Sequence, residues 1–229
     1  MAYAWDSQNI KTYNNRTGRY KFDVEYKFIL AQLGNSRRKL LDIGGGSGRF
    51  ALPLSKLIAE VVVVDPNLDA LEILKSRIFS ENIKLYHGTL SDYVEGGDFD
   101  LVIIIEVLGM IENITEFFMT IAKITFPEAI VILTVANPKS WRFTLKKIML
   151  LFGRNYYPYN FITIEKLERI ITSSNFKILE KKGFNWIPLP LSSDSIFVNL
   201  FVQLEKLLGL SKWINQSPWV LIAAQKNKI

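Results

Sequence analysis

Short apolar runs alternate with segments of helical spacing along most of the chain. The runs cover residues 40–43, 61–65, 83–87, 99–106 and 129–135, and the segments around them repeat apolar residues three and four positions apart. Among the helices predicted in these segments are those over residues 22–33, 49–58 and 114–124. Runs of this length that are apolar at nearly every position are typical of strands buried on both faces. Strands that alternate with amphipathic helices predict a parallel sheet whose crossover helices cover both faces.

The last third of the chain predicts two further strands, at residues 176–186 and 219–225, after a helix at residues 163–173. A strongly apolar helix is predicted over residues 196–208, between these two strands. Another helix is predicted to begin at Asn137 and Pro138, a favourable N-cap and first helical residue, and to end at Phe152 before Gly153. The chain therefore predicts seven strands with two helical additions near the end.

The composition fits a globular domain with a full core, because 49% of the 229 residues are hydrophobic and 22% are charged. We expect one domain over residues 1–229, with residues 1–35 as an N-terminal cap segment and residues 137–160 and 187–217 as lid insertions. The sequence has no cysteine and one histidine. Disulfides, thiolate catalysis and Cys- or His-rich metal sites are therefore excluded, and no metal is expected.

The excess of positive charge is local. The net charge is +6, and the stretch between Asn137 and Asn160 carries no acid. Its basic residues are Lys139, Arg142, Lys146, Lys147 and Arg154. This disfavours a general nucleic-acid surface. The helix over residues 139–152 is basic and amphipathic, which indicates a peripheral membrane contact, an acidic partner or a substrate lid, and equally fits the solvated face of a core helix.

The start of the chain has no apolar core of signal-peptide length, and no apolar run approaches the ~20 residues of a membrane span. We therefore expect a cytoplasmic protein, peripheral to a membrane if the basic helix binds one.

A glycine-rich turn follows the first strand. Gly44, Gly45, Gly46, Ser47 and Gly48 stand between the apolar run and helix-compatible residues. Glycines permit unusual dihedrals and close approach of a ligand, and the free N–H groups at a following helix start can face that ligand. The dinucleotide fingerprint G-x-G-x-x-G is incomplete, because Arg49 stands where its third glycine would be.

Three stretches together carry a family resemblance. They are Asp42-x-Gly44-x-Gly46-x-Gly48, the run Val-Val-Val-Val ending at Asp65, and Phe99-Asp-Leu-Val leading to Glu106-Val-Leu. In this order they resemble the class I S-adenosylmethionine-dependent methyltransferases, and the stretch after the fifth strand is similar to the ubiquinone-biosynthesis O-methyltransferases and related type-11 methyltransferases. The resemblance implies an α/β, Rossmann-like, seven-stranded and mostly parallel sheet with an antiparallel last strand, helices on both faces and a small helical lid.

The resemblance also implies the cofactor S-adenosylmethionine and the residues that bind it. Asp42 would order the methionine amino end, Asp65 the ribose hydroxyls, Glu106 the methionine side, and the loop after the third strand the adenine. Thr89 replaces the acid that is usual in that loop, so Thr89 Oγ1 and Asp92 are both open as substitutes. The expected cofactor-binding residues are Asp42, Gly44, Gly45, Gly46, Gly48, Asp65, Pro66, Thr89, Leu90 and Glu106.

The function implied is methyl transfer to a small, apolar or amphiphilic acceptor. No catalytic residue is assigned: Gly109-Met110 stand where the family often has Glu-His, and His87 is expected to be structural. Tyr13, Tyr20, Glu106 and Tyr159 stay open as bases, and the oligomeric state is open. The alternatives are an RNA or protein methyltransferase, which the basic insert favours, and a non-catalytic methyltransferase-like binding module, which the variant Thr89 and Met110 favour.

Overall fold

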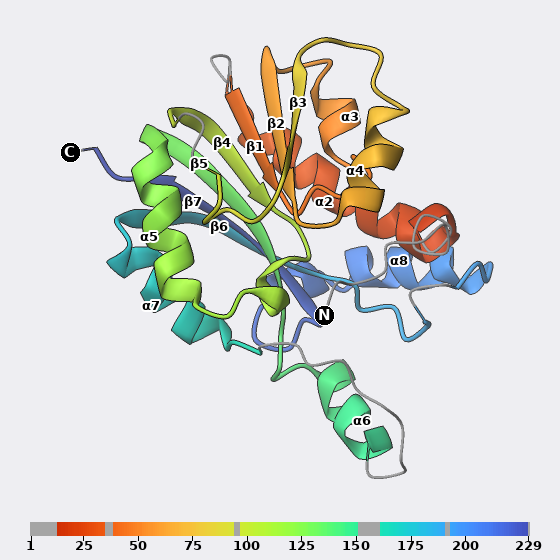
Figure 1. Cartoon of the computed structure of the whole chain (residues 1–229). Helices are drawn as coiled ribbons and strands as arrows, with labels where there is room; N and C mark the ends of the chain where they lie inside the picture. Colours follow the sequence, from red (N-terminus) through yellow and green to blue (C-terminus); the bar gives the residue numbers. More distant parts are fainter. Residues whose placement is uncertain (1–12, 35–38, 94–96, 151–160, 191–192, 229) are drawn as a thin grey trace.

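The computed structural model describes residues 13–34, 39–93, 97–150, 161–190 and 193–228, the side chains of residues 146–150 excepted. Its centre is a seven-stranded sheet of order β3-β2-β1-β4-β5-β7-β6 (Figure 1). The strands from β3 through β5 are parallel, whereas β7 runs antiparallel to β5 and β6. The strands are β1 (Lys39–Ile43), β2 (Glu60–Asp65), β3 (Ile83–His87), β4 (Phe99–Ile104), β5 (Thr125–Ala136), β6 (Phe176–Phe184) and β7 (Trp219–Lys226). The predicted seven-stranded, mostly parallel sheet is confirmed.

Helices cover both faces of the sheet, as predicted (Figure 1). One face carries α5 (Ile114–Ile124) and α7 (Ile164–Ser173), and the other carries α2 (Arg16–Gln32), α3 (Ala51–Leu54) and α4 (Leu68–Lys75). Beyond the carboxyl ends of the parallel strands lie α6 (Trp141–Leu150), α8 (Phe197–Leu207) and the 3-10 turns η1 (Leu108–Met110) and η2 (Leu210–Lys212). No helix in the described ranges has the length and apolar character needed to cross a bilayer.

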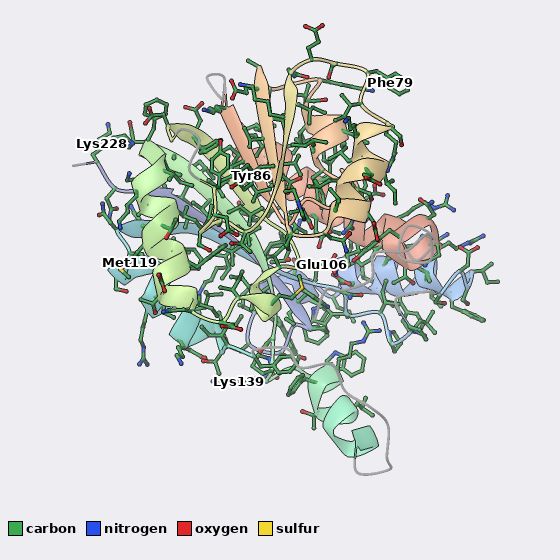
Figure 2. The ribbon with its side chains drawn as sticks, in the orientation of Figure 1. Phe79, Tyr86, Glu106, Met119, Lys139 and Lys228 are labelled. Carbon is green, nitrogen blue, oxygen red and sulfur yellow. The ribbon has the colours of Figure 1, made fainter. Side chains whose placement is uncertain are left out.

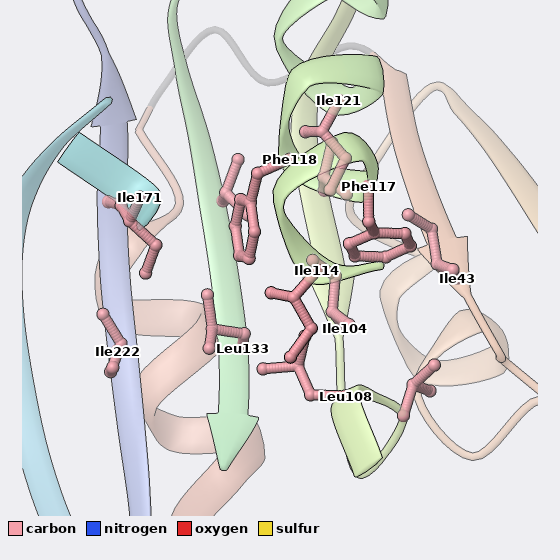
Figure 3. Packing of buried hydrophobic residues seen from close by; sticks show 14 of the residues in the cluster. Ile43, Ile104, Leu108, Ile114, Phe117, Phe118, Ile121, Leu133, Ile171 and Ile222 are labelled. Atoms are coloured by element: carbon pink, nitrogen blue, oxygen red, sulfur yellow. The ribbon is translucent and has the colours of Figure 1, made fainter. Parts of the chain in front are cut away.

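The core consists of two layers, one on each side of the sheet. On one side, Phe117, Phe118 and Ile121 of α5 pack towards Ile104 of β4 and Leu133 of β5 (Figure 3). Successive residues of a strand point to opposite faces, so neighbouring positions of β5 contribute to the two layers in turn. Because both faces are covered, the central strands are apolar at nearly every position.

Several element boundaries differ from the prediction. The helix predicted over residues 22–33 begins earlier, at Arg16, because the Asn15 side chain accepts a hydrogen bond from the Gly18 amide and caps it. The strand predicted over residues 129–135 begins earlier, at Thr125. Its pairing with β4 has a register shift between Phe99 and Leu101. The helix predicted over residues 49–58 is a single turn, α3, so a helix dipole contributes little at the glycine-rich loop.

Asn137 does not cap the helix that follows it. Its Nδ2 donates to the carbonyls of Asn215 and Ser217, both at 3.0 Å, and the helix begins only at Trp141. Ser140 stands in the cap position, with its Oγ 3.3 Å from the Phe143 amide nitrogen. Asn137 therefore ties the end of β5 to the loop before β7. Residues 151–160, which include the predicted helix end, Arg154 and Tyr159, lie outside the described residues.

Candidate functional site

The glycine-rich loop joins β1 to α3 at the carboxyl edge of the sheet, where open α/β folds place their sites. Gly44, Gly46 and Gly48 have φ values of +69°, +52° and +85°, which favour glycine. A Cβ on Gly44 would lie 2.3 Å from Val107 Cγ2, and a Cβ on Gly48 would lie 2.3 Å from Leu74 Cδ1. The packing of the protein itself therefore requires these two glycines, a reason that the sequence argument did not include.

Asp42 and Asp65 lie beside this loop on adjacent strands. The two oxygens of Asp65 accept hydrogen bonds from the amides of Gly46 and Asn67, each at 2.8 Å. Asp42 is 2% exposed, and its Oδ2 has no hydrogen-bond partner among the described residues. A Cβ on Gly45 would lie 2.7 Å from that oxygen. A buried acceptor without a partner is rare in proteins, so this oxygen is suited to a donor from a ligand.

The two carboxyl groups influence each other electrostatically. Burial, and then the negative charge of Asp65, raise the pKa of Asp42 to about 7, against the opposing Ala51 amide. Burial also raises the pKa of Asp65, while the Asn67 and Gly46 amides oppose that rise. Two buried carboxyl groups on adjacent strands form a site that favours a positively charged ligand.

Glu106 follows β4 and lies near the centre of the molecule, beyond the carboxyl ends of the parallel strands (Figure 2). It adopts φ +65°, and its amide donates to Thr134 Oγ1 of β5 at 2.6 Å. Its two carboxylate oxygens contact Lys21 Nζ at 2.7 Å and Arg49 Nη1 at 2.9 Å. Burial opposes ionisation of Glu106, but the charges of Lys21 and Arg49 outweigh it and hold the pKa of Glu106 below its ordinary value.

Lys21 and Glu25 complete this network, and the sequence argument missed both. Glu25 is fully buried, and its Oε2 lies 2.8 Å from Arg49 Nη2. Lys21 is also buried, with Nζ 3.7 Å from the centre of the Trp219 ring. The available signal is their spacing, because Lys21 and Glu25 share one helical face with the buried Phe28. Two cations and two carboxylates thus balance at the junction of α2 with the glycine-rich loop.

The loop after β3 contains Thr89 and Asp92, the two residues considered as substitutes for the adenine contact. Thr89 Oγ1 donates to Asp92 Oδ2 at 2.6 Å, and the Thr89 amide donates to the same oxygen at 2.9 Å. Thr89 and Asp92 therefore bind each other. Leu90 is buried in the core, and Pro66 follows Asp65 with its carbonyl 3.1 Å from His87 Nε2. His87 makes this contact from an exposed position at the end of β3.

Two of the candidate bases, Tyr13 and Tyr20, are tyrosines whose hydroxyls are held by carboxylates. Tyr13 OH donates to Glu106 Oε2 at 3.2 Å, and burial, then the Glu106 charge, raise the pKa of Tyr13. Tyr20 OH lies 2.7 Å from the carboxylate of Glu205. Hydroxyls held by carboxylates in this way are poor proton acceptors.

Among the residues placed by the structure, no group of acids and histidine is arranged to hold a metal ion.

Fold, glycine-rich loop and carboxylate pair together define a class I S-adenosylmethionine-dependent methyltransferase. The chain belongs to the methyltransferase-domain family, whose model matches residues 15–181. It is 26% identical over 183 residues to a ubiquinone biosynthesis O-methyltransferase of Rickettsia bellii, covering 73% of this chain and 75% of that protein. It is 29% identical over 199 residues to the protein of that name from Rickettsia typhi, covering 80% and 79%.

The fold is similar to solved methyltransferases at low sequence identity. Magnesium protoporphyrin IX methyltransferase from Synechocystis, solved with bound S-adenosylhomocysteine, matches with a TM-score of 0.68 at 16% identity. That match covers 99% of this chain and 90% of the other. The protein is thus an S-adenosylmethionine-dependent methyltransferase.

Proposed function

We propose that this enzyme transfers the methyl group of S-adenosylmethionine to a hydroxyl of a small, apolar or amphiphilic acceptor. The buried, unpartnered Asp42 oxygen beside Asp65 and the glycine-rich loop is the observation that carries the cofactor half. The hydroxyl is proposed because the curated relatives are named as O-methyltransferases of ubiquinone biosynthesis. The apolar character draws support from the aromatic pair Trp186 and Trp213 and the apolar residues of α8 beyond the sheet edge.

In this proposal the loop from Gly44 to Gly48 forms the floor of the cofactor site. Asp42 accepts a bond from the methionine amino group, and Asp65, next to Pro66, accepts bonds from the ribose hydroxyls with its remaining lone pairs. The Thr89 amide is occupied by Asp92, so the adenine contact falls to the backbone of Leu90 in the same loop. Glu106, fixed by its cations, lines the methionine side.

When bound, the cofactor supplies an electrophilic methyl group on a sulfonium. The residues of this chain then hold the acceptor oxygen in line with that group and exclude water, and such positioning is worth ~7–11 kcal/mol. The proposed lid comprises residues 137–160 and 187–217 of a single domain, with residues 1–35 as its cap. The tie between the Thr17 amide and the Ser193 carbonyl, at 3.2 Å, supports a joint action of cap and lid.

Calorimetric titration with S-adenosylhomocysteine tests the cofactor site. We expect Asp65→Ala to weaken binding by about 10- to 100-fold, since a charge-assisted hydrogen bond contributes ~1.5–3 kcal/mol. Asp23→Ala, an exposed acid on α2, is the matched control and should bind as the wild type does. Unchanged affinity in Asp65→Ala would reject the assigned role of Asp65.

Labelling of a cell extract with methyl-labelled cofactor, followed by mass spectrometry, tests the acceptor half. We expect a low-molecular-weight, extractable product. Labelling confined to RNA or protein would support the alternative enzyme class. The absence of any turnover would support the non-catalytic alternative.

A peripheral membrane contact of this cytoplasmic enzyme through residues 139–152 belongs to the same proposal. Leu145 is 50% exposed on α6, which supports it. Lys139 is less available than the sequence implied, because its Nζ is paired with Glu165 at 2.8 Å. Flotation with anionic liposomes at low salt tests the contact, and a protein that stays in the soluble fraction would reject it.

A further inference from the structure

Arg142 carries a guanidinium group that is turned into the protein without an acid beside it. Its Nη2 donates to the carbonyl of Leu189, and its Nη1 is buried with no hydrogen-bond partner in the described parts of the chain. Burial lowers the pKa of Arg142. This differs from Arg49, whose buried guanidinium is paired with both Glu25 and Glu106. An isolated buried cation is costly, so a counter-ion from a ligand would stabilise it.

The acids nearest in sequence are absent or engaged elsewhere. Residues 138–162 contain no aspartate or glutamate at all. Glu165 is paired with Lys139 at 2.8 Å, and Asp194 accepts a hydrogen bond from the Arg16 amide at 2.9 Å. An anion for Arg142 is therefore best supplied from outside the chain.

The position of Arg142 connects it with the methyl-transfer site. It lies in α6, which follows β5, and Thr134 of β5 accepts the hydrogen bond from the Glu106 amide. Its partner Leu189 lies in the segment between β6 and α8, and Ser193 of that segment binds the start of α2. The guanidinium thus joins two segments at the carboxyl edge of the sheet, on the side of the proposed acceptor.

Aromatic side chains occur in the same segment. Phe143 follows Arg142 in α6, and its ring packs edge-on against Phe161 with a centroid distance of 4.5 Å. An aromatic pair in this segment is suited to a flat, partly apolar ligand. The fork of an arginine matches the two oxygens of a carboxylate.

We propose that Arg142 binds a carboxylate of the acceptor and that the acceptor is therefore an aromatic or amphiphilic acid. This inference rests on the proposed function and names the chemical class of its acceptor. A small molecule is favoured over a lipid headgroup, because Nη1 is buried and a bilayer surface would not reach it without a movement of α6. Arg142 would orient the acceptor, while its hydroxyl faces the cofactor.

Binding of a matched pair of probes, 4-hydroxybenzoate and its neutral analogue 4-hydroxybenzamide, tests the proposal by ligand-detected NMR on the full chain. We expect the wild type to prefer the carboxylate by about tenfold or more, the gain from one charge-assisted pair. Arg142→Gln should lose the preference, and Arg142→Lys should keep part of it. Arg169→Gln, an exposed arginine on α7, is the control and should keep all of it.

Affinity for S-adenosylhomocysteine and thermal stability are measured on the same variants. We expect Arg142→Gln to bind the cofactor product normally and to be at least as stable as the wild type, since it removes an uncompensated buried charge. Equal binding of both probes to the wild type, binding of neither at millimolar concentration, or a preference that survives in Arg142→Gln would each overturn the proposal. Failure of the wild type to bind S-adenosylhomocysteine would instead reject the proposed function. The two failures can be told apart because the probe preference is measured without cofactor.

Discussion

Replacement of Asp42 by asparagine removes a buried negative charge while keeping the shape of the side chain. The pKa of Asp42 is raised to about 7 by burial and by Asp65, whereas an unperturbed aspartate titrates at about 3.9. Each pKa unit corresponds to ~1.4 kcal/mol, so keeping Asp42 ionised in the folded state costs at most about 4 kcal/mol. The folded state therefore binds the Asp42 proton more tightly than the unfolded state does. This proton binding contributes stability that is fully present below about pH 4 and is lost as pH rises through about 7.

We therefore expect Asp42→Asn to be more stable than the wild type at about pH 8 and less stable than it by about 1–3 kcal/mol at about pH 4, where the protonated wild-type carboxyl carries no cost of ionisation. The gain should be about 1–3 kcal/mol in the free energy of unfolding, because the new amide buries donors that cost ~1–3 kcal/mol when unpaired. Urea unfolding at a series of pH values measures both quantities. The same variant should bind S-adenosylmethionine about 10- to 100-fold more weakly, because a neutral amide replaces the anionic acceptor.

Asp23→Asn makes the same chemical change at an exposed position of α2 and should alter neither quantity. A change in the stability of Asp42→Asn that is equal at both ends of the pH series would refute the argument from burial. An unchanged affinity for the cofactor would separate the two parts of the reasoning. The carboxylate would then be costly without being used for binding.

Three further substitutions test the network, the loop and the edge of β5. Lys21→Met should cost about 3–5 kcal/mol in urea unfolding, because it leaves Glu106 with one cation fewer in a buried site, and addition of Glu106→Gln should restore part of that loss. Gly48→Ala should cost at least ~1–2 kcal/mol, since φ is +85° and its Cβ would meet Leu74; a wild-type melting temperature would contradict this. Asn137→Ala should cost about 1–3 kcal/mol by leaving the carbonyls of Asn215 and Ser217 without this donor, without changing affinity for S-adenosylhomocysteine, and a change in that affinity would show that the tie reaches the site.

The parts of the fold that depend on local patterns could be predicted from the sequence. The bounds of β3 and α5 agree with the alternation at residues 83–87 and the helical spacing at residues 114–124. The seven-stranded, mostly parallel sheet and its antiparallel last strand came from the family resemblance and are confirmed. In these elements the local signal and the burial agree, because the apolar positions are the ones that face the core.

The prediction failed where polar side chains carry the structure. The buried face of α2 includes Lys21 and Glu25, so its hydrophobic pattern is weak, and residues 16–21 lay outside the predicted helix. Asn137 had the sequence of a helix cap, yet its amide binds carbonyls almost eighty residues further along the chain, in the loop before β7. Such contacts depend on which segments meet in space. A pattern read along one segment does not contain that information.

The distribution of paired and unpaired charges separates support from binding at the sheet edge. Glu106 and Glu25 are matched by Lys21 and Arg49, so this group is neutral as a whole and holds α2 against the loop. Oδ2 of Asp42 lacks a partner among the described residues, at the end where a sulfonium cofactor with a protonated amino group is proposed to bind. A ligand cation there would favour the ionised carboxylate and return the cost of burying it, so cofactor binding should release a proton below about pH 7.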